Sequence, residues 1–197
     1  DRSPSRGLGD VYKRQRQWLT QSSKVLILDP TYGEYSHVLE KVVRCRVDRV
    51  PLKYKNGFAL DLNDFDQALE KKYDLIVLVN PNSPTGKFLS KEKMIKILSQ
   101  IPLTTRVWVD ETYMEYAGFG QSLEQVAVSS ENVIVCKSMS KVYALSGARV
   151  AYLCGGQHQM EPLRTITPPW VISMPAQLAG VYASYSVNYY YMPFRSN

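Results

Sequence analysis

The sequence predicts an α/β fold of three layers, in which helices cover both faces of a mainly parallel β-sheet. Short apolar and β-branched runs recur along the chain, and segments with helical spacing separate them. This alternation is typical of strand–helix–strand units. One run, Leu75–Val79 (LIVLV), is apolar at every position, as expected of a strand buried on both faces of a parallel sheet.

Six runs are predicted to be strands, although charged residues interrupt the second of them. They are Lys24–Leu28, Val42–Val50, Leu75–Val79, Arg106–Val109, Val133–Val135 and Val150–Leu153. Three segments are predicted to be helices from their apolar spacing and capping residues. They are Leu62–Lys72, with Asp61 or Asn63 as its N-cap, a segment from Ser90 to about Ser99, and Met174–Tyr185.

Composition favours a soluble globular protein. The chain has 197 residues, of which 45% are hydrophobic, and no apolar run approaches the roughly 20 residues of a membrane span. No secretory signal is evident, and the three cysteines form neither a C-x-x-C motif nor an even framework. We therefore expect a reducing, cytoplasmic setting, no membrane association and no metal site.

The net charge of +6 does not indicate nucleic-acid binding. Residues 1–17 hold five arginines and lysines against two aspartates, and the remaining charge is spread without a basic stripe. This polar segment is predicted to be a non-native or disordered leader. A cofactor-binding domain over residues 18–185, and an irregular tail over 186–197, complete the expected organisation.

Polar turn-forming segments follow four of the predicted strands. They read DPTYGEY (29–35), NPNSPTG (80–86), DETYMEY (110–116) and SMSK (138–141). Ligands of open α/β sheets bind beyond the carboxyl ends of the strands. These four segments are therefore expected to form one site.

The residue types in these segments match the needs of a planar, phosphorylated, electron-accepting cofactor. Such a cofactor needs an amine for a Schiff base, a carboxylate for a ring nitrogen, an aromatic stacking face, and hydroxyls with a cation for a phosphate. The four segments and the arginine that follows them supply Lys141, Asp110, Tyr113, Tyr32, Ser138, Ser140 and Arg149.

Three blocks resemble the class I and II aminotransferases, the pyridoxal-phosphate enzymes of fold type I. The blocks are NPNSPTG, VDETYMEY and SMSKVYALSGAR, in the family's order and near its spacing. Within the family, DPTYGEYS and the SK-x-x-A-L-x-G-x-R run look most similar to histidinol-phosphate aminotransferases. The PPW at 168–170 is similar to the neighbouring threonine-phosphate decarboxylases.

The resemblance implies a role for each candidate residue toward pyridoxal 5'-phosphate. It implies that Lys141 forms the Schiff base and moves the substrate proton. It implies that Asp110 pairs with the ring nitrogen, and that Tyr113 donates to the ring oxygen. It also implies that Tyr32 stacks on the cofactor ring, and that the cofactor phosphate is bound by Ser138, Ser140 and Arg149.

The sequence departs from the family at the residue before P-T-G. The family usually has asparagine there, as a second donor to the cofactor's ring oxygen. Here that position is Ser83, and Asn82 lies one residue earlier. Ser83 is therefore the aligned candidate, and Asn82 is a neighbouring candidate that would reach the cofactor only through a shift of the loop.

Other motifs fit the chain less well. NPNSPTGKF lacks the first glycine and the hydroxyl residue of a P-loop, and the one G-x-G lies in the leader with no strand before it. The S-x-x-K at Ser138–Lys141 lacks the partner motifs of serine β-lactamases. Each candidate residue alone could be a turn former, a helix cap or a solvated charge; the ordered set argues otherwise.

Three functions stay open from the sequence. The first is amino transfer between an amino acid or amino phosphate, such as a histidinol-phosphate-like compound, and a 2-oxo acid. The second is decarboxylation of a phosphorylated amino acid, and the third is an inactive fragment. The resemblance implies that parts of the whole enzyme lie outside this chain, including a small domain, and that the whole enzyme is a homodimer.

Overall fold

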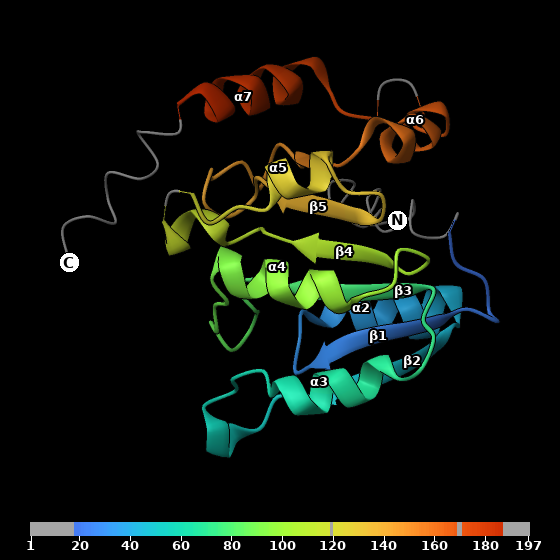
Figure 1. Ribbon diagram of the computed structural model, residues 1–197. Coiled ribbons are helices and arrows are strands. Elements are labelled where there is room, and N and C mark those ends of the chain that lie inside the picture. The colour runs from blue at the N-terminus through green and yellow to red at the C-terminus, as the bar shows by residue number, and fades with distance from the viewer. Residues whose placement is uncertain (1–17, 119, 169–170, 187–197) are drawn as a thin grey trace.

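The computed structural model describes residues 18–118, 120–168 and 171–186. Its centre is one six-stranded sheet in the order β2-β1-β3-β4-β5-β6, parallel throughout except for the antiparallel strand β6 (Figure 1). The strands are β1 (Lys24–Asp29), β2 (Arg46–Pro51), β3 (Leu75–Val79), β4 (Arg106–Asp110), β5 (Val133–Ser138) and β6 (Ala151–Cys154). The predicted α/β fold with a mainly parallel sheet is confirmed.

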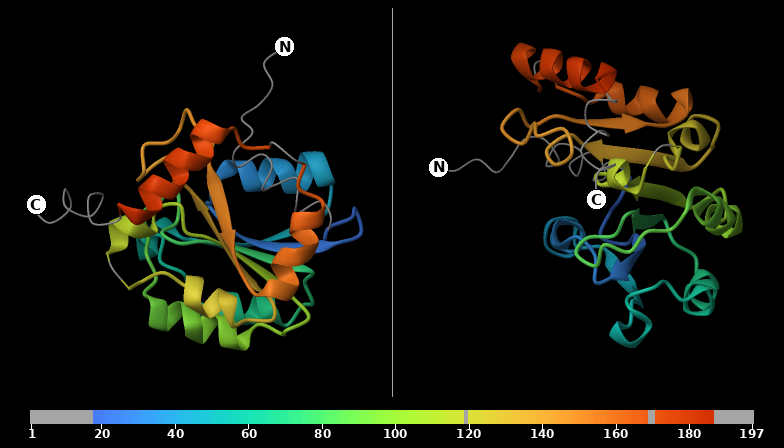
Figure 2. Two further views of the ribbon diagram at one scale, coloured as in Figure 1. Left: turned by 90° about the horizontal axis from the view of Figure 1, so that it is seen from above. Right: turned by 90° about the vertical axis from the view of Figure 1, so that its left-hand side faces the viewer.

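Helices pack on both faces of this sheet, and Figure 2 shows α3, α4 and α5 on one side and α2 on the other. The α-helices are α2 (Gly33–His37), α3 (Leu62–Leu69), α4 (Lys91–Gln100), α5 (Glu124–Val128), α6 (Gln157–Thr165) and α7 (Met174–Tyr185). A π-helical segment, η1 (Val38–Val43), extends α2, and two 3-10 turns are η2 (Tyr54–Asn56) and η3 (Met114–Ala117).

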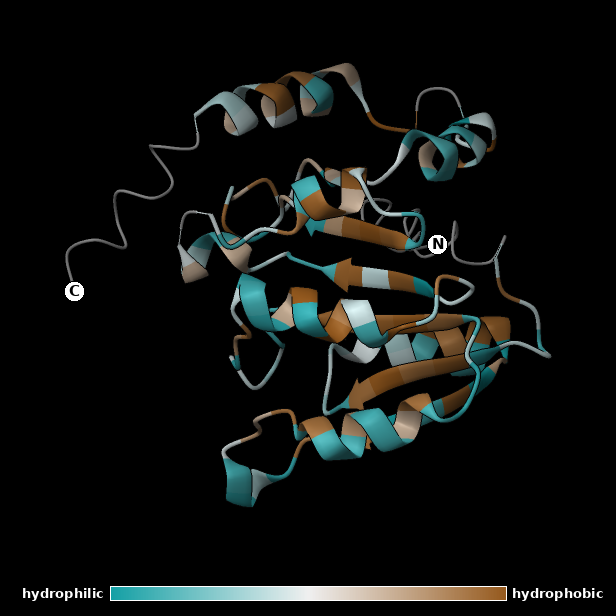
Figure 3. Cartoon of the chain, in the orientation of Figure 1, coloured by the Kyte–Doolittle hydropathy of each residue, from teal (hydrophilic) through white to brown (hydrophobic). Residues whose placement is uncertain are grey.

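Alternation along each strand divides the core into two apolar clusters. In β1, Val25 and Ile27 belong to the cluster beneath α2, η1 and α6, whereas Leu26 and Leu28 belong to the cluster beneath α3, α4 and α5. Successive side chains of a strand point to opposite faces of the sheet, which explains this division. Figure 3 shows the apolar strands in brown, and polar residues in teal on the helices α3 and α4 beside them.

The second predicted strand is partly wrong. Residues up to Val43 continue the π-helical segment, Arg44 adopts a left-handed backbone (φ 63°), and β2 begins only at Arg46. Val38, Leu39 and Val43 are buried against the sheet, and helical spacing is what brings all three to it. Val42 and Val43, which were predicted to begin the strand, therefore belong to a helical segment.

The predicted helix caps are confirmed at both sites. Asp61 accepts a hydrogen bond from the backbone N–H of Asn63 at 2.9 Å, and Ser90 accepts one from Lys93 at 3.5 Å. Helix α3 ends at Leu69, three residues earlier than predicted. Of the PPW motif, residues 169 and 170 lie outside the described residues, as do residues 1–17 and 187–197.

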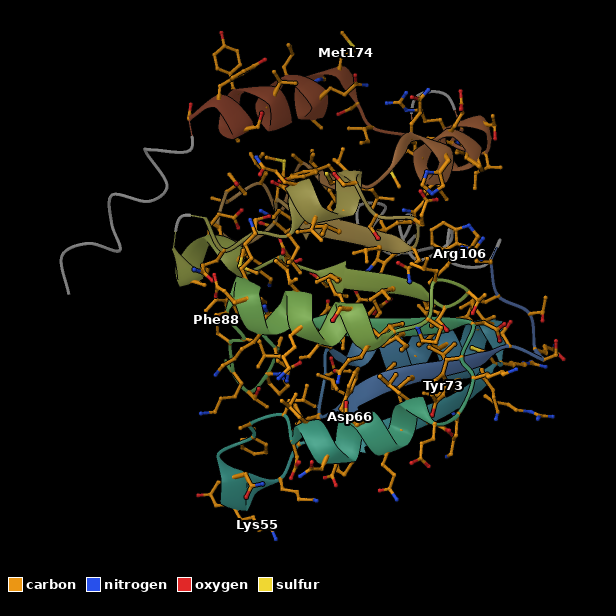
Figure 4. All side chains as sticks on the ribbon, in the orientation of Figure 1. Lys55, Asp66, Tyr73, Phe88, Arg106 and Met174 are labelled. Carbon is orange, nitrogen blue, oxygen red and sulfur yellow. The ribbon has the colours of Figure 1, made fainter. Side chains whose placement is uncertain are left out.

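The parallel strands all end at one edge of the sheet. Figure 4 labels Phe88 near this edge, and Tyr73 and Arg106 at the opposite one. Among the described residues, no helix is long and apolar enough to cross a membrane. The same residues contain no group of three or more His, Cys, Asp or Glu side chains arranged to hold a metal ion.

Candidate active site

A cavity of about 130 Å³ lies at the carboxyl ends of β3, β4 and β5. Eight of the nine predicted site residues line it, drawn from four segments that are far apart in the sequence. The lining residues are Tyr32, Val79, Ser83, Asp110, Thr112, Tyr113, Ser138, Ser140, Lys141, Ser146 and Arg149. The expectation that the loops after the strands meet at one place is therefore fulfilled by the geometry.

Asp110, the last residue of β4, is a buried carboxylate with two hydrogen-bond donors. Its Oδ1 accepts from the backbone N–H of Thr112 at 2.9 Å, and its Oδ2 accepts from the Tyr35 hydroxyl at 2.7 Å. Burial raises the pKa of Asp110, and these hydrogen bonds oppose the rise. The structure describes no cation paired with this carboxylate. A positively charged group on a ligand would therefore interact favourably with it.

Ser138 and Ser140 place two hydroxyl groups beside the end of β5. Their Oγ atoms are 3.0 Å apart, and Ser138 Oγ also accepts from the Ser140 backbone N–H at 3.3 Å. The backbone N–H of Ser138 in turn donates to Thr112 Oγ1 at 3.3 Å. Thr112 therefore joins the ends of the two strands that carry Asp110 and Ser138.

Arg149, in the connection between β5 and β6, lines the same cavity as these hydroxyls. Its backbone is left-handed (φ 58°), a conformation that costs free energy in residues other than glycine and is concentrated at functional sites. Nη1 donates to the carbonyl of Ser146 at 2.8 Å. Nε is buried and has no hydrogen-bond partner among the described residues, so a donor is left for an anionic ligand.

Lys141 begins the turn after β5 and is exposed at the rim of the cavity. Its ammonium makes no hydrogen bond or ion pair with any residue that the structure describes. The turn itself is anchored, because Val142 and Tyr143 are buried in a third apolar cluster with Ala176 and Ala183 of α7. A lysine on an anchored turn is available for reaction with a ligand.

Tyr32 and Tyr113 bring two aromatic rings to the cavity. Tyr32 is 39% exposed, so one part of its ring is available for stacking. Burial raises the pKa of its phenol, the charges of Glu34 and Asp110 add to the rise, and that of Arg149 opposes it. Tyr113 lies at the start of η3 and lines both this cavity and an adjoining one.

Asn82 does not line the cavity, which departs from its predicted place at the cofactor. Its amide nitrogen donates to the carbonyl of Pro30 at 3.0 Å and to Thr85 Oγ1 at 2.9 Å, and its Oδ1 accepts from Thr31 at 3.3 Å. These bonds join the loops after β1 and β3. Both the nitrogen and the oxygen of the Asn82 side chain are engaged in these bonds. Ser83 is the residue of this loop that lines the cavity.

Two residues that the sequence analysis missed act directly on the candidates. Tyr35 donates to Asp110, and Thr112 bonds both Asp110 and the backbone of Ser138. Tyr35 lies in α2, three positions after Tyr32, which is the N-cap of that helix. Since residues three apart share a side of a helix, that spacing was the available signal.

Lys137, the residue before Ser138, is buried rather than at the surface. Its side chain is 6% exposed, and its ammonium lies 3.0 Å from Glu115, 3.5 Å from Glu124 and 3.6 Å from Glu111. Burial disfavours the charged amine, but the three carboxylates outweigh it and raise the pKa of Lys137. Tyr143 also donates to Glu115, at 3.0 Å. We call these four charged residues the ion cluster.

The ion cluster lies on the opposite face of the sheet from the cavity. Asp110 and Ser138 point into the cavity, whereas Glu111 and Lys137, each the adjacent residue, point to the face covered by α5. Glu115 of η3 accepts from both Lys137 and Tyr143, so it connects the segment after Tyr113 to the turn that carries Lys141.

The chain is thus an α/β protein with a cavity, lined by a lysine and an arginine, at the carboxyl ends of a mainly parallel sheet. Residues 14–187 match the family described as aminotransferase class I and II. The chain belongs to this family.

Curated relatives agree with this membership. The chain is 31% identical over 172 residues to a histidinol-phosphate aminotransferase of Staphylococcus aureus, covering 85% of this chain and 47% of that protein. The chain thus spans about half the length of the curated relatives it matches.

Two solved structures share its fold. A histidinol-phosphate aminotransferase from Sinorhizobium meliloti, in complex with pyridoxal-5'-phosphate, has a TM-score of 0.83 at 21% identity over 94% of this chain and 50% of that one. A decarboxylase from Sulfurospirillum multivorans has a TM-score of 0.81 at 24% identity over 97% of this chain and 55% of that one.

Proposed function

We propose that this chain is the pyridoxal-phosphate-binding part of an aminotransferase that moves an amino group between an amino acid or amino phosphate and a 2-oxo acid. The observation that carries the proposal is the single cavity where Lys141, Asp110 and Arg149 converge from separate strands. Membership of the class I and II aminotransferase family supports it. The histidinol-phosphate aminotransferases among its relatives suggest a histidinol-phosphate-like donor.

The donor set of the cavity fits this cofactor. The unpartnered Nε of Arg149 and the hydroxyls of Ser138 and Ser140 suit a phosphate. The buried carboxylate of Asp110 suits a protonated ring nitrogen, because such a cation would stabilise its ionised form. The exposed amine of Lys141 suits an aldehyde.

Each residue then has a definite task. When bound, pyridoxal phosphate supplies an electron-withdrawing ring that stabilises negative charge at the substrate α-carbon. Asp110 holds the proton on the ring nitrogen, and Tyr113 and Ser83 donate to the ring oxygen. Lys141 Nζ would take up and return a proton at the substrate α-carbon, as a general acid–base.

An adjoining cavity of about 440 Å³ is the proposed space for the substrate's side chain. It shares Ser83 and Tyr113 with the first cavity. Its remaining lining residues are Pro81, Asn82, Pro84, Gly86, Phe88, Tyr116 and Ala117, none of them charged. A planar ring such as an imidazole fits these aromatic and prolyl walls better than a carboxylate does.

Peptide mapping tests the proposal on the chain itself. Pyridoxal phosphate is added, borohydride reduces the bond it forms with a lysine nitrogen to a stable secondary amine, and the digest is analysed by mass spectrometry. We expect the label on Lys141 at substoichiometric cofactor, because the anion site and Asp110 hold the aldehyde there. Label spread over surface lysines such as Lys87 and Lys55 would contradict the proposal.

The phosphate site gives a separate prediction. Replacing Arg149 with methionine should weaken pyridoxal phosphate binding by about 10-fold to 100-fold, as expected when a hydrogen bond to a charged group is lost. Binding of pyridoxal, which has no phosphate, should change by less than about threefold. Equal weakening of both ligands, measured by fluorescence titration, would show that Arg149 does not contact the phosphate.

Decarboxylation of a phosphorylated amino acid is the second candidate, suggested by the PPW at 168–170. The two reactions use the same cofactor site and differ in the α-carbon bond that breaks. They are separated by assaying carbon dioxide release from threonine phosphate against 2-oxoglutarate-dependent amino transfer from histidinol phosphate. If a chain that carries the label on Lys141 shows neither activity, it is a cofactor-binding fragment without turnover.

The whole protein is proposed to be a cytoplasmic homodimer. Helix α7 supports a dimer, because Met174, Leu178, Val181 and Tyr182 form an apolar stripe at helical spacing and are each more than half exposed. Three free cysteines support a reducing compartment. Sedimentation that shows only monomer, and fractionation of the tagged protein outside the cytoplasm, would contradict these two points.

A further inference from the structure

A directional pair of hydrogen bonds leads from the core of the sheet to the site. Trp108 Nε1 donates to the hydroxyl oxygen of Tyr35 at 3.0 Å, and the Tyr35 hydroxyl donates to Asp110 Oδ2 at 2.7 Å. The indole N–H can only donate, and a phenol carries one proton. Because Trp108 occupies the phenol oxygen as a donor, the proton of Tyr35 is directed to the carboxylate.

Burial makes this arrangement rigid. Trp108 and Tyr35 are 0% exposed and belong to the cluster beneath α2, and Asp110 is 4% exposed. Trp108 and Asp110 are two residues apart on β4 and therefore share a face, and Tyr35 reaches both of them from α2. The hydrogen bond from α2 to β4 fixes the orientation of the carboxylate without a ligand.

The hydrogen bonds also bear on the charge of Asp110. A buried carboxylate without donors tends to take up a proton, and a protonated Asp110 could not pair with a cationic ring nitrogen. The bond from Tyr35 is as short as the O–H···O⁻ bonds that favour an ionised acceptor. With Thr112 on Oδ1 and Tyr35 on Oδ2, each oxygen keeps a lone pair for a further donor.

We propose that Tyr35, oriented by Trp108, is a positioning residue that keeps Asp110 ionised and aimed at the ring nitrogen of the cofactor. The inference rests on the proposed function, because it needs a ligand whose ring nitrogen faces Asp110. It makes Tyr35 part of the cofactor site although its side chain is not among the residues that line the cavity.

Two cofactor analogues test the proposal. Tyr35→Phe should raise the dissociation constant of pyridoxal phosphate about 10-fold, as for loss of a charge-assisted hydrogen bond. The deaza analogue, in which C–H replaces the ring nitrogen, should bind the variant within about twofold of the unaltered chain. On an Asp110→Asn background, Tyr35→Phe should have little further effect on pyridoxal phosphate binding.

The matched control is Tyr73→Phe, which removes a buried hydroxyl that donates to Asp48 at 3.0 Å, near the opposite edge of the sheet (Figure 4). It should leave the binding of both cofactors unchanged. Equal weakening of both cofactors by Tyr35→Phe would reduce Tyr35 to a structural residue and overturn the inference, as would no weakening of either. If the unaltered chain shows no Lys141-dependent binding, the proposed function fails, and this inference fails with it.

Discussion

Lys141→Ala is expected to abolish the borohydride-stable adduct with pyridoxal phosphate. The adduct needs a primary amine at the cavity, and Lys141 is the lysine that lines it. Alanine leaves the anion site and Asp110 in place, so the cofactor should still bind, but reversibly. The expected result is complete loss of covalent label, measured by mass spectrometry after reduction.

Pyridoxamine phosphate provides a control that separates bonding from shape. It carries an amine in place of the aldehyde and cannot form a covalent bond with lysine. Its dissociation constant should differ by less than about threefold between Lys141→Ala and the unaltered chain. Lys87→Ala, at an exposed lysine of the neighbouring loop, should keep the full label. A stoichiometric label on the Lys141→Ala chain would refute the assignment of the amine.

Lys137→Met is expected to lower the free energy of unfolding by about 3–5 kcal/mol, as for removal of one partner from a buried ion pair. The substitution keeps the length of the side chain but leaves Glu111 and Glu115, which are 0% and 3% exposed, without their cation. Urea unfolding followed by circular dichroism measures the loss. Lys137→Arg should recover part of it.

The pH dependence of this loss has a definite sign. Burial already raises the pKa of Glu111, and removal of the cation should raise it further. A carboxyl whose pKa is higher in the folded state than in the unfolded state destabilises the fold increasingly as pH rises above its unfolded pKa. The destabilisation by Lys137→Met should therefore be larger at pH 8 than at pH 5.

A surface ion pair serves as the comparison. Lys71 lies 3.1 Å from Asp48, but these side chains are 59% and 38% exposed. Lys71→Met should cost at most about 1 kcal/mol, as is usual for exposed pairs. Losses of equal size for Lys71→Met and Lys137→Met would show that the ion cluster contributes no more than a surface contact.

The ion cluster also bears on the site, because Glu115 accepts hydrogen bonds from both Lys137 and Tyr143. Tyr113 begins the turn that contains Glu115, and Lys141 lies two residues before Tyr143. The segment that follows Tyr113 and the turn that carries Lys141 are therefore connected through Glu115, on the face of the sheet opposite the cavity. This explains how a lysine exposed at the rim can sit on a turn that is well anchored.

The sequence alone determined the fold class and most of the cavity. The apolar, β-branched run Leu75–Val79 forms a buried strand, because backbone pairing and burial both favour that conformation for it. The polar turns after the strands must meet, because parallel strands end at one edge. Eight candidate residues could be brought together by that rule without any coordinates.

Only the tertiary structure decided what surrounds the cavity. Lys137 is buried because three carboxylates from η3, α5 and the end of β4 converge on it, and no local pattern encodes that convergence. Asn82 faces away because its amide joins two loops that are some fifty residues apart. The contact of Tyr35 with Asp110 spans 75 residues. Strand and turn signals are local, whereas the partners of a buried polar group are chosen by packing between distant segments, and that is known only once the chain has folded.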